Sequence, residues 1–212
     1  MRKVLLTGFE PFDGQAINPS EEIAREINDA TIARHKVVGA LLPCVFGAAL
    51  KELKHQLKLH DPAVVICLGQ AGGRAEITPE RVAINIDDAR IADNAGQQPV
   101  DKPVVKDGPA AYFSTLPIKA IVQELRKHDI PAAVSQTAGT FVCNHVFYGL
   151  MHELALHRPG VRGGFVHVPF VPEQTKDQPS LPFELMTAGI RLAIAAAVDY
   201  RRDLKVAAGA TS

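Results

Sequence analysis

Ala63-Val-Val-Ile-Cys-Leu68 is an uninterrupted apolar run, and Gly69-Gln-Ala-Gly-Gly-Arg74 follows it as a turn. A strand without a polar face is buried on both sides, which is typical of the centre of a parallel sheet that helices cover on both faces. This run therefore predicts an α/β fold and serves as the reference for the remaining segments.

Strand-like and helix-like runs alternate on both sides of this central run. We predict strands at residues 3–7, 36–41, 63–68, 81–86, 132–135 and 163–168. We predict helices that begin after Asn18, cover residues 50–57, 118–125 and 146–154, and close the chain from residue 182 to about residue 200. Such alternation favours one domain, residues 1–212, built as an α/β/α sandwich around a mainly parallel, twisted sheet. We expect residues 207–212 to be a frayed tail.

The charge balance of the chain limits the kinds of molecule that it is expected to bind. The chain has 212 residues, with 23 Lys and Arg against 23 Asp and Glu, so its formal net charge is zero. This balance argues against nucleic acid or an anionic membrane as a partner, because both require a basic surplus. No apolar run approaches the roughly 20 residues that span a bilayer. Three cysteines are an odd number, and we expect a cytoplasmic protein with free thiols.

The sequence contains no complete motif for binding a familiar cofactor or a metal. In the turn after Leu68, Ala71 and Arg74 stand where a dinucleotide-binding fingerprint has glycines. The sequence has no P-loop, no Gly-x-Ser-x-Gly elbow and no cysteine pair at metal-ligand spacing. His152 and His157 do not share a helix face, so they do not form a zinc-protease pair. We therefore expect neither a cofactor nor a metal.

Cys143 lies where a turn gives way to a strongly periodic helix, in Gly139-Thr-Phe-Val-Cys-Asn144. The unpaired N–H groups and the dipole of a helix amino terminus favour thiolate over thiol, so Cys143 is a candidate nucleophile. The alternative is a small buried apolar residue. We prefer that structural interpretation for Cys44 and Cys67, which lie inside apolar runs.

His167 and Glu80 are the candidate partners of a nucleophilic cysteine. His167 lies near the carboxyl end of a predicted strand, where active sites of open α/β sheets gather. Glu80 could hold one nitrogen of its imidazole while the other nitrogen faces the sulfur. The alternatives are a core histidine for His167 and a solvated surface pair of Glu80 with Arg81.

Four motifs give the chain a family resemblance that runs from Val4 to about Tyr200. They are Thr7-Gly-Phe-Glu-Pro-Phe12 with Asn18-Pro-Ser20; Gly69-Gln-Ala-Gly-Gly73; Glu80-Arg-Val-Ala-Ile-Asn85 through Ala95-Gly96; and Gly139-Thr-Phe-Val-Cys-Asn144 with Phe165-Val-His-Val-Pro169. With these motifs in this order, the chain closely resembles the pyroglutamyl-peptidase I family of cysteine exopeptidases. One departure is Asp13, where the family often passes directly from Phe to Gly.

The resemblance implies both an activity and a set of site residues. It implies hydrolytic removal of an amino-terminal 5-oxoproline from peptides through a thioester, by a homotetramer. It implies a catalytic triad of Glu80, Cys143 and His167. The implied substrate pocket comprises Phe9, Phe12, Gln70, Asn18 and Val142, and Arg90 is a second candidate oxyanion donor beside the backbone N–H of Cys143. We expect Phe9 and Phe12 to lie on a loop after the first strand, between Gly8 and Gly14.

Two non-peptidase interpretations stay open at this point. One is a non-enzymatic small-molecule binder with a redox-sensing Cys143, for which a resolving cysteine is expected nearby. Neither Cys44 nor Cys67 is adjacent to Cys143 in the sequence. The other is a nucleoside-binding or phosphorolytic protein, for which the sequence offers no anion site. Turnover of a chromogenic 5-oxoprolyl amide would separate all three.

Overall fold

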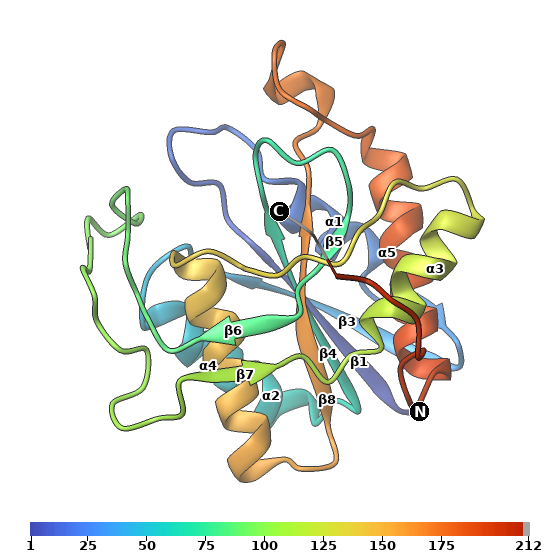
Figure 1. Ribbon diagram of the computed structural model, residues 1–212, viewed down its shortest axis with the longest axis horizontal. Coiled ribbons are helices and arrows are strands. Elements are labelled where there is room, and N and C mark those ends of the chain that lie inside the picture. Colours follow the sequence, from blue (N-terminus) through green and yellow to red (C-terminus); the bar gives the residue numbers. More distant parts are fainter. Residues whose placement is uncertain (210–212) are drawn as a thin grey trace.

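A six-stranded sheet runs through the computed structural model, which describes residues 1–209 (Figure 1). The strands, in spatial order, are β2 (Thr31–Ile32), β3 (His35–Leu42), β1 (Lys3–Phe9), β4 (Val64–Gln70), β8 (Arg162–Val168) and β5 (Thr78–Pro79). The four central strands pair in parallel, and the short edge strands β2 and β5 pair antiparallel. The predicted mainly parallel sheet with an apolar centre is confirmed, with β4 as the run at residues 63–68.

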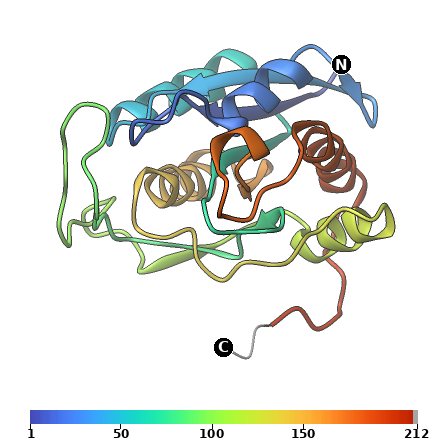
Figure 2. The same ribbon diagram turned by 90° about the horizontal axis from the view of Figure 1, so that it is seen from above.

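Helices cover both faces of the sheet, as predicted. One face carries α1 (Pro19–Ile27), α3 (Ile118–Lys127) and α5 (Phe183–Asp199), and the other carries α2 (Ala48–His60) and α4 (Val142–His157). Figure 2 shows α4 and α5 on opposite sides of the central strands. A short 3₁₀ helix, η1 (Pro172–Gln174), lies between β8 and α5.

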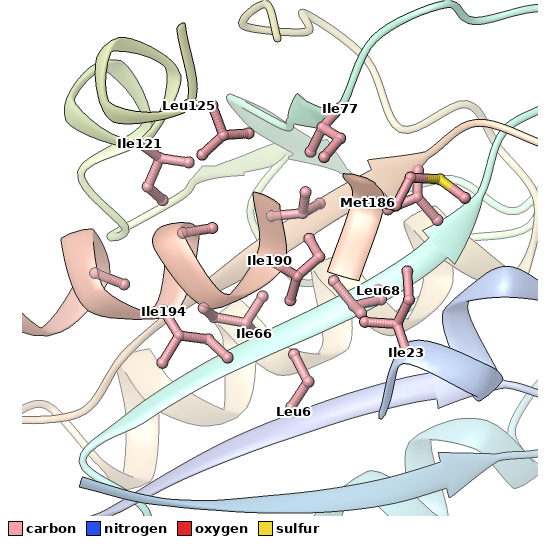
Figure 3. Close-up of a cluster of buried hydrophobic side chains, with 14 of the residues drawn as sticks. Leu6, Ile23, Ile66, Leu68, Ile77, Ile121, Leu125, Met186, Ile190 and Ile194 are labelled. Carbon is pink, nitrogen blue, oxygen red and sulfur yellow. The ribbon is translucent and has the colours of Figure 1, made fainter. Parts of the chain in front are cut away.

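The alternation of side chains along β4 divides the core into two clusters. Ile66 and Leu68 point toward α5, where Ile190 packs against them (Figure 3). Val65 and Cys67 point the other way, into the cluster beneath α2 and α4. Because successive side chains of a strand face opposite sides, every second residue of the neighbouring β8 also faces α4. This alternation decides which side of the sheet carries the candidate site.

A separate two-stranded sheet lies beside α4. It pairs β6 (Val82–Ile84) with β7 (Ala111–Phe113) in antiparallel fashion, so the strand predicted at residues 81–86 exists but is shorter. Between these strands, residues 87–108 form the predicted long loop, closed by one antiparallel bridge between Asp87 and Lys102. The side chain of Asn85 hydrogen-bonds the backbone of Val105 in both directions, which fastens the loop to β6.

The predicted strand at residues 132–135 is not formed. Instead, Ala132 and Ser135 make isolated parallel bridges to Ile77 and Glu80. The backbone of Ser135 donates to Pro79 O, and Arg81 donates back to Ser135 O. Pro79 stands between the two bridges and has no N–H to donate, so the ladder breaks into two pieces.

The end of the chain packs more closely than expected. Residues 207–209 belong to the tail for which we expected fraying, but Arg81 donates to the carbonyl of Ala208, and Lys119 donates to that of Val206. The other residues of that predicted tail, 210–212, lie outside the described residues. Within residues 1–209, no helix has the length and apolar character needed to cross a membrane.

Candidate active site

The candidate residues meet at the carboxyl end of the central strands. Gln70 is the last residue of β4, His167 is the second-last residue of β8, and Phe9 is the last residue of β1. The loops after these three strands gather at one end of the sheet, at the top of Figure 1. This is the edge at which open α/β folds usually bind their ligands.

Glu80 and His167 form a buried pair. Imidazole Nδ1 of His167 lies 2.7 Å from Oε1 of Glu80, and because an ionised carboxylate only accepts, Nδ1 carries the proton and donates. The exposed fraction is 0% for Glu80 and 4% for His167. The antiparallel edge strand β5 delivers Glu80, whose backbone N–H donates to Phe165 O. The interpretation of Glu80 as a solvated surface partner of Arg81 is therefore wrong.

Cys143 reaches this pair through a gap in the sheet surface. Gly69 of β4 is the register partner of His167 in β8, and both face α4. A Cβ at Gly69 would lie 2.9 Å from Sγ of Cys143, which is closer than real Cβ contacts. Only a residue without a side chain lets the sulfur settle against the strand beside His167.

Burial sets the protonation of the thiol and the imidazole. Burial is the largest cause that raises the pKa of Cys143 well above its ordinary value, and Cys44 and Glu80 raise it further. Burial also lowers the pKa of His167, against the opposing effect of Glu80. Both directions favour a thiol and a neutral imidazole in the resting pair, and so act against the thiolate that the helix terminus favours.

Glu80 keeps its charge despite complete burial. Burial alone would raise its pKa, but the hydrogen bond and charge of His167, together with Arg74 and Ser135, lower the pKa below its ordinary value. The ionised carboxylate can therefore hold the imidazole in one tautomer, with Nε2 left free of the proton.

Two groups could stabilise negative charge beside Cys143. Cys143 is the second residue of α4, which has no side-chain cap within the described residues, so the N–H groups of its first turn are directed outward. Arg90 is exposed and lines the adjacent cleft. Cys143 itself is not among the residues that line this cleft, but Phe141, two residues before it, is.

A cleft of about 640 Å³ is lined by Gln70, which follows Gly69 on β4, and by Phe141, which precedes α4. The three candidate catalytic residues are not among its lining residues. Its wall carries the half-buried ring of Phe12, which packs against Phe141 with ring centroids 5.9 Å apart. The remaining lining residues come from several loops: Asp13, Gln15, Gln70, Gly72, Asp88, Arg90, Ile91, Thr140, Phe170 and Gln178. The rings of Phe12, Phe141 and Phe170 suit a flat, uncharged ring, while Asp13, Asp88 and Arg90 add charge to other parts of the lining.

Gln70 is held in one orientation. Gln174 of η1 donates from its Nε2 to Oε1 of Gln70 at 2.8 Å and to the carbonyl of Ile17, while its own Oε1 accepts from the backbone of Val171. The Gln70 oxygen is thereby occupied as an acceptor. Its NH₂ group is left to donate toward the cleft that it lines.

Three residues of the predicted pocket do not line the cleft. We expected Phe9 on a loop, but it is the last residue of β1, and its ring is buried against Phe165. Asn18 caps α1, as predicted: its Oδ1 accepts from Ser20 N, and its Nδ2 donates to Glu10 O. Val142 is fully buried as the first residue of α4.

Sequence reasoning missed Arg74 and Gln174. Arg74 donates to Oε1 of Glu80 at 2.7 Å. In the sequence it is notable only because it replaces a glycine of the dinucleotide-binding fingerprint. A buried carboxylate needs a cation or several donors, so the search for the nearest basic residue other than Arg81 would have found it. For Gln174, the sequence offers no comparable signal.

Cys44 and Cys67 behave as structural residues, as predicted. Both are buried, and burial raises the pKa of each thiol to about 12. Cys143 is partly exposed. Within residues 1–209, no group of three His, Cys, Asp or Glu side chains is arranged to hold a metal ion.

Comparison with known proteins gives consistent matches over the whole chain. The family model described as pyroglutamyl peptidase matches residues 2–200. The pyrrolidone-carboxylate peptidase of Bacillus mycoides (strain KBAB4) is 54% identical over 214 residues and 100% of both chains. That of Cupriavidus taiwanensis is 57% identical over 213 residues and 99% of both chains.

Solved structures agree. Pyroglutamyl peptidase I of Bacillus amyloliquefaciens is 51% identical with a TM-score of 0.95, covering 96% of this chain and 100% of that chain. The pyrrolidone carboxyl peptidase of Thermococcus litoralis is 41% identical with a TM-score of 0.95, covering 98% of this chain and 100% of that chain. The chain therefore belongs to the pyroglutamyl peptidase family of cysteine peptidases.

Proposed function

We propose that this chain removes an amino-terminal 5-oxoproline from peptides, with Cys143 as the nucleophile, His167 as base and acid, and Glu80 as the residue that orients His167. The observation that carries the proposal is the convergence of the three side chains on one point of the sheet. Glu80 holds His167 at 2.7 Å, and the register partner of His167, Gly69, lies against the sulfur of Cys143.

Acyl transfer follows from this arrangement. Sγ of Cys143 attacks the carbonyl carbon that joins 5-oxoproline to the next residue, while the thiol proton passes to Nε2 of His167. The tetrahedral intermediate collapses, His167 protonates the departing amine, and a thioester remains. A water then gives one proton to His167 and adds to the thioester carbonyl. Release of 5-oxoproline returns that proton to Cys143.

The substrate pocket must recognise a ring that carries no charge. The lactam nitrogen of 5-oxoproline is acylated, so no carboxylate is needed to bind an ammonium group. We assign the ring to the cleft beside Phe12, with the NH₂ of Gln70 donating to the lactam carbonyl.

The other predicted residues act less directly. Phe9 shapes the pocket from below by packing on Phe165, and Asn18 fixes the loop after β1 through the carbonyl of Glu10. The N–H groups at Val142 and Cys143 serve as oxyanion donors, together with the side chain of Arg90.

Turnover of a chromogenic 5-oxoprolyl amide tests the function directly. We expect hydrolysis by the wild-type chain and none by Cys143→Ala, with the same thermal unfolding midpoint for both. Equal turnover by Cys143→Ala would rule out this mechanism. A chain that binds 5-oxoproline without hydrolysing the amide would instead be the small-molecule binder, which the family membership disfavours.

Location and assembly are also proposals. We propose a cytoplasmic enzyme, as its three free cysteines suggest, that acts on peptides as the homotetramer that the family resemblance implies. Light scattering on the purified chain measures the assembly, and a monomer at micromolar concentration would contradict it.

A further inference from the structure

Glu80 is a buried acid with two partners on the same oxygen. Its Oε1 accepts from Nδ1 of His167 and from Nη1 of Arg74, each at 2.7 Å. The carboxylate has an exposed fraction of 0% and is ionised. Charge in such a place requires compensation, and neutral His167 supplies a hydrogen bond but no positive charge.

Arg74 joins the acid to the segment that leads to the nucleophile. Its Nη1 also donates to the hydroxyl of Thr78 on β5, and its Nη2 donates to the carbonyl of Thr137 at 3.0 Å. Residues 135–141 lead directly into α4 and Cys143. One guanidinium therefore ties together the turn after β4, the strand that carries Glu80 and the approach to Cys143.

Arg81 shows that this role does not follow from charge and sequence proximity alone. It is the immediate neighbour of Glu80, yet its side chain bonds Gln136 and the carbonyl of Ala208. The two arginines are both partly exposed and both bond the segment that precedes α4. Only Arg74 reaches the acid, so Arg81 is a matched control.

We propose that Arg74 is a positioning residue, which fixes the carboxylate of Glu80 and compensates its charge so that His167 is held toward Cys143. This inference rests on the proposed function of the three residues. Arg74 does not contact the reacting atoms.

The electrostatic effects of Arg74 oppose those of Glu80. Burial is the main cause that lowers the pKa of His167; Glu80 raises this pKa and Arg74 lowers it. The same opposition acts on Cys143, whose pKa burial, Cys44, Glu80 and Cys67 raise and Arg74 lowers. Loss of Arg74 leaves the negative charge uncompensated, so the pair of Glu80 and His167 takes up a proton at higher pH.

The experiment compares Arg74→Gln, Arg74→Lys and the control Arg81→Gln by the pH dependence of kcat/KM on a 5-oxoprolyl amide. For Arg74→Gln we expect the acid limb to move to higher pH and kcat to fall about tenfold or more, with KM nearly unchanged. Arg74→Lys should restore the position of the limb but only part of kcat, since an ammonium cannot make the forked contacts. Arg81→Gln should keep the wild-type limb.

A second readout keeps the test independent of turnover. The rate at which iodoacetamide alkylates Cys143 is measured against pH in the same variants, with unfolding midpoints as a check on folding. The proposal is overturned if Arg74→Gln and Arg81→Gln have the same pH dependence, both of kcat/KM at acid pH and of the rate of alkylation. Failure of the wild type to hydrolyse the amide would overturn the proposed function instead. If Arg74→Gln does not fold, a wild-type kcat in Arg74→Lys is the contradicting result.

Discussion

Gly69 lies so close to Cys143 that a single added methyl group would occupy the space of the sulfur: its carbon would be 2.9 Å from Sγ and 2.7 Å from the ring of Phe165. The sulfur of Cys143 can lie in this position only because residue 69 of β4 has no side chain.

Gly69→Ala should therefore impair catalysis more than folding. Displacement of the sulfur by a fraction of an ångström to about 1 Å can cost on the order of 10²-fold in rate, and overpacking costs about 1–3 kcal/mol of stability. Steady-state kinetics and thermal unfolding measure the two effects. Gly160→Ala is the control, because a Cβ there meets nothing within 4 Å. Wild-type kcat/KM in Gly69→Ala would contradict the proposed position of the nucleophile.

Alkylation should occur at one cysteine. Cys143 is partly exposed, whereas Cys44 and Cys67 are buried, so iodoacetamide should label Cys143 alone and abolish activity in proportion. Peptide mass spectrometry locates the label, and incubation with EDTA is the parallel control, which should leave activity unchanged. Inactivation without a label on Cys143 is the contradicting outcome.

The pH profile should report the buried imidazole. The base must be neutral, and burial lowers the pKa of His167, so kcat/KM should be lost only as pH falls through a value below the ordinary 6.5 of histidine. Glu80→Gln removes a group that raises this pKa, so its acid limb should move to still lower pH. We expect Glu80→Gln to keep some turnover and His167→Ala to lose nearly all of it. An unmoved curve at full rate in Glu80→Gln would remove Glu80 from the mechanism.

The pocket should reject charged amino termini. Amides of Gln, Glu or Pro carry an ammonium or secondary ammonium group, which would lose its hydration against the rings of Phe12 and Phe141, where we place the 5-oxoproline ring. We expect the 5-oxoprolyl amide to be hydrolysed and these three to be inert in the same assay. Comparable turnover of the glutaminyl amide would contradict the assignment of the pocket.

Gln174→Glu tests how Gln70 is oriented. A carboxylate can still accept from Val171 but cannot donate to Gln70, so the amide of Gln70 should rotate and turn its oxygen toward the lactam carbonyl. Loss of one hydrogen bond, about 1 kcal/mol, predicts a KM raised about five- to tenfold with kcat less affected. Gln178→Glu places the same charge on the cleft as a control. Equal effects of the two variants would show that only charge matters.

The sequence predicts those parts of the site that local patterns determine. The apolar run at β4, the periodic helix after Cys143 and the strand end at His167 all follow from the spacing of residues along short segments. Their meeting at one edge follows from parallel pairing. These features depend on neighbours within a few residues, which is why the α/β fold could be predicted.

Features that depend on distant partners could not be predicted in this way. The edge strand β5 is only Thr78–Pro79, too short for a periodic signal, and it exists because β8 lies beside it. The contact of Gln174 with Gln70 likewise joins η1 to the end of β4 through tertiary structure. The protonation state of Cys143 depends on how many apolar atoms surround the sulfur, which no local pattern reveals.

The pairing of β5 with β8 has a consequence for the order in which activity arises. During synthesis Glu80 leaves the ribosome well before Arg162–Val168, so the acid cannot dock on β8 until that strand has also emerged. The nucleophile, too, emerges ahead of its base. Turnover therefore requires residues 162–168, and its first appearance in a refolding experiment should mark completion of the sheet rather than collapse of the core.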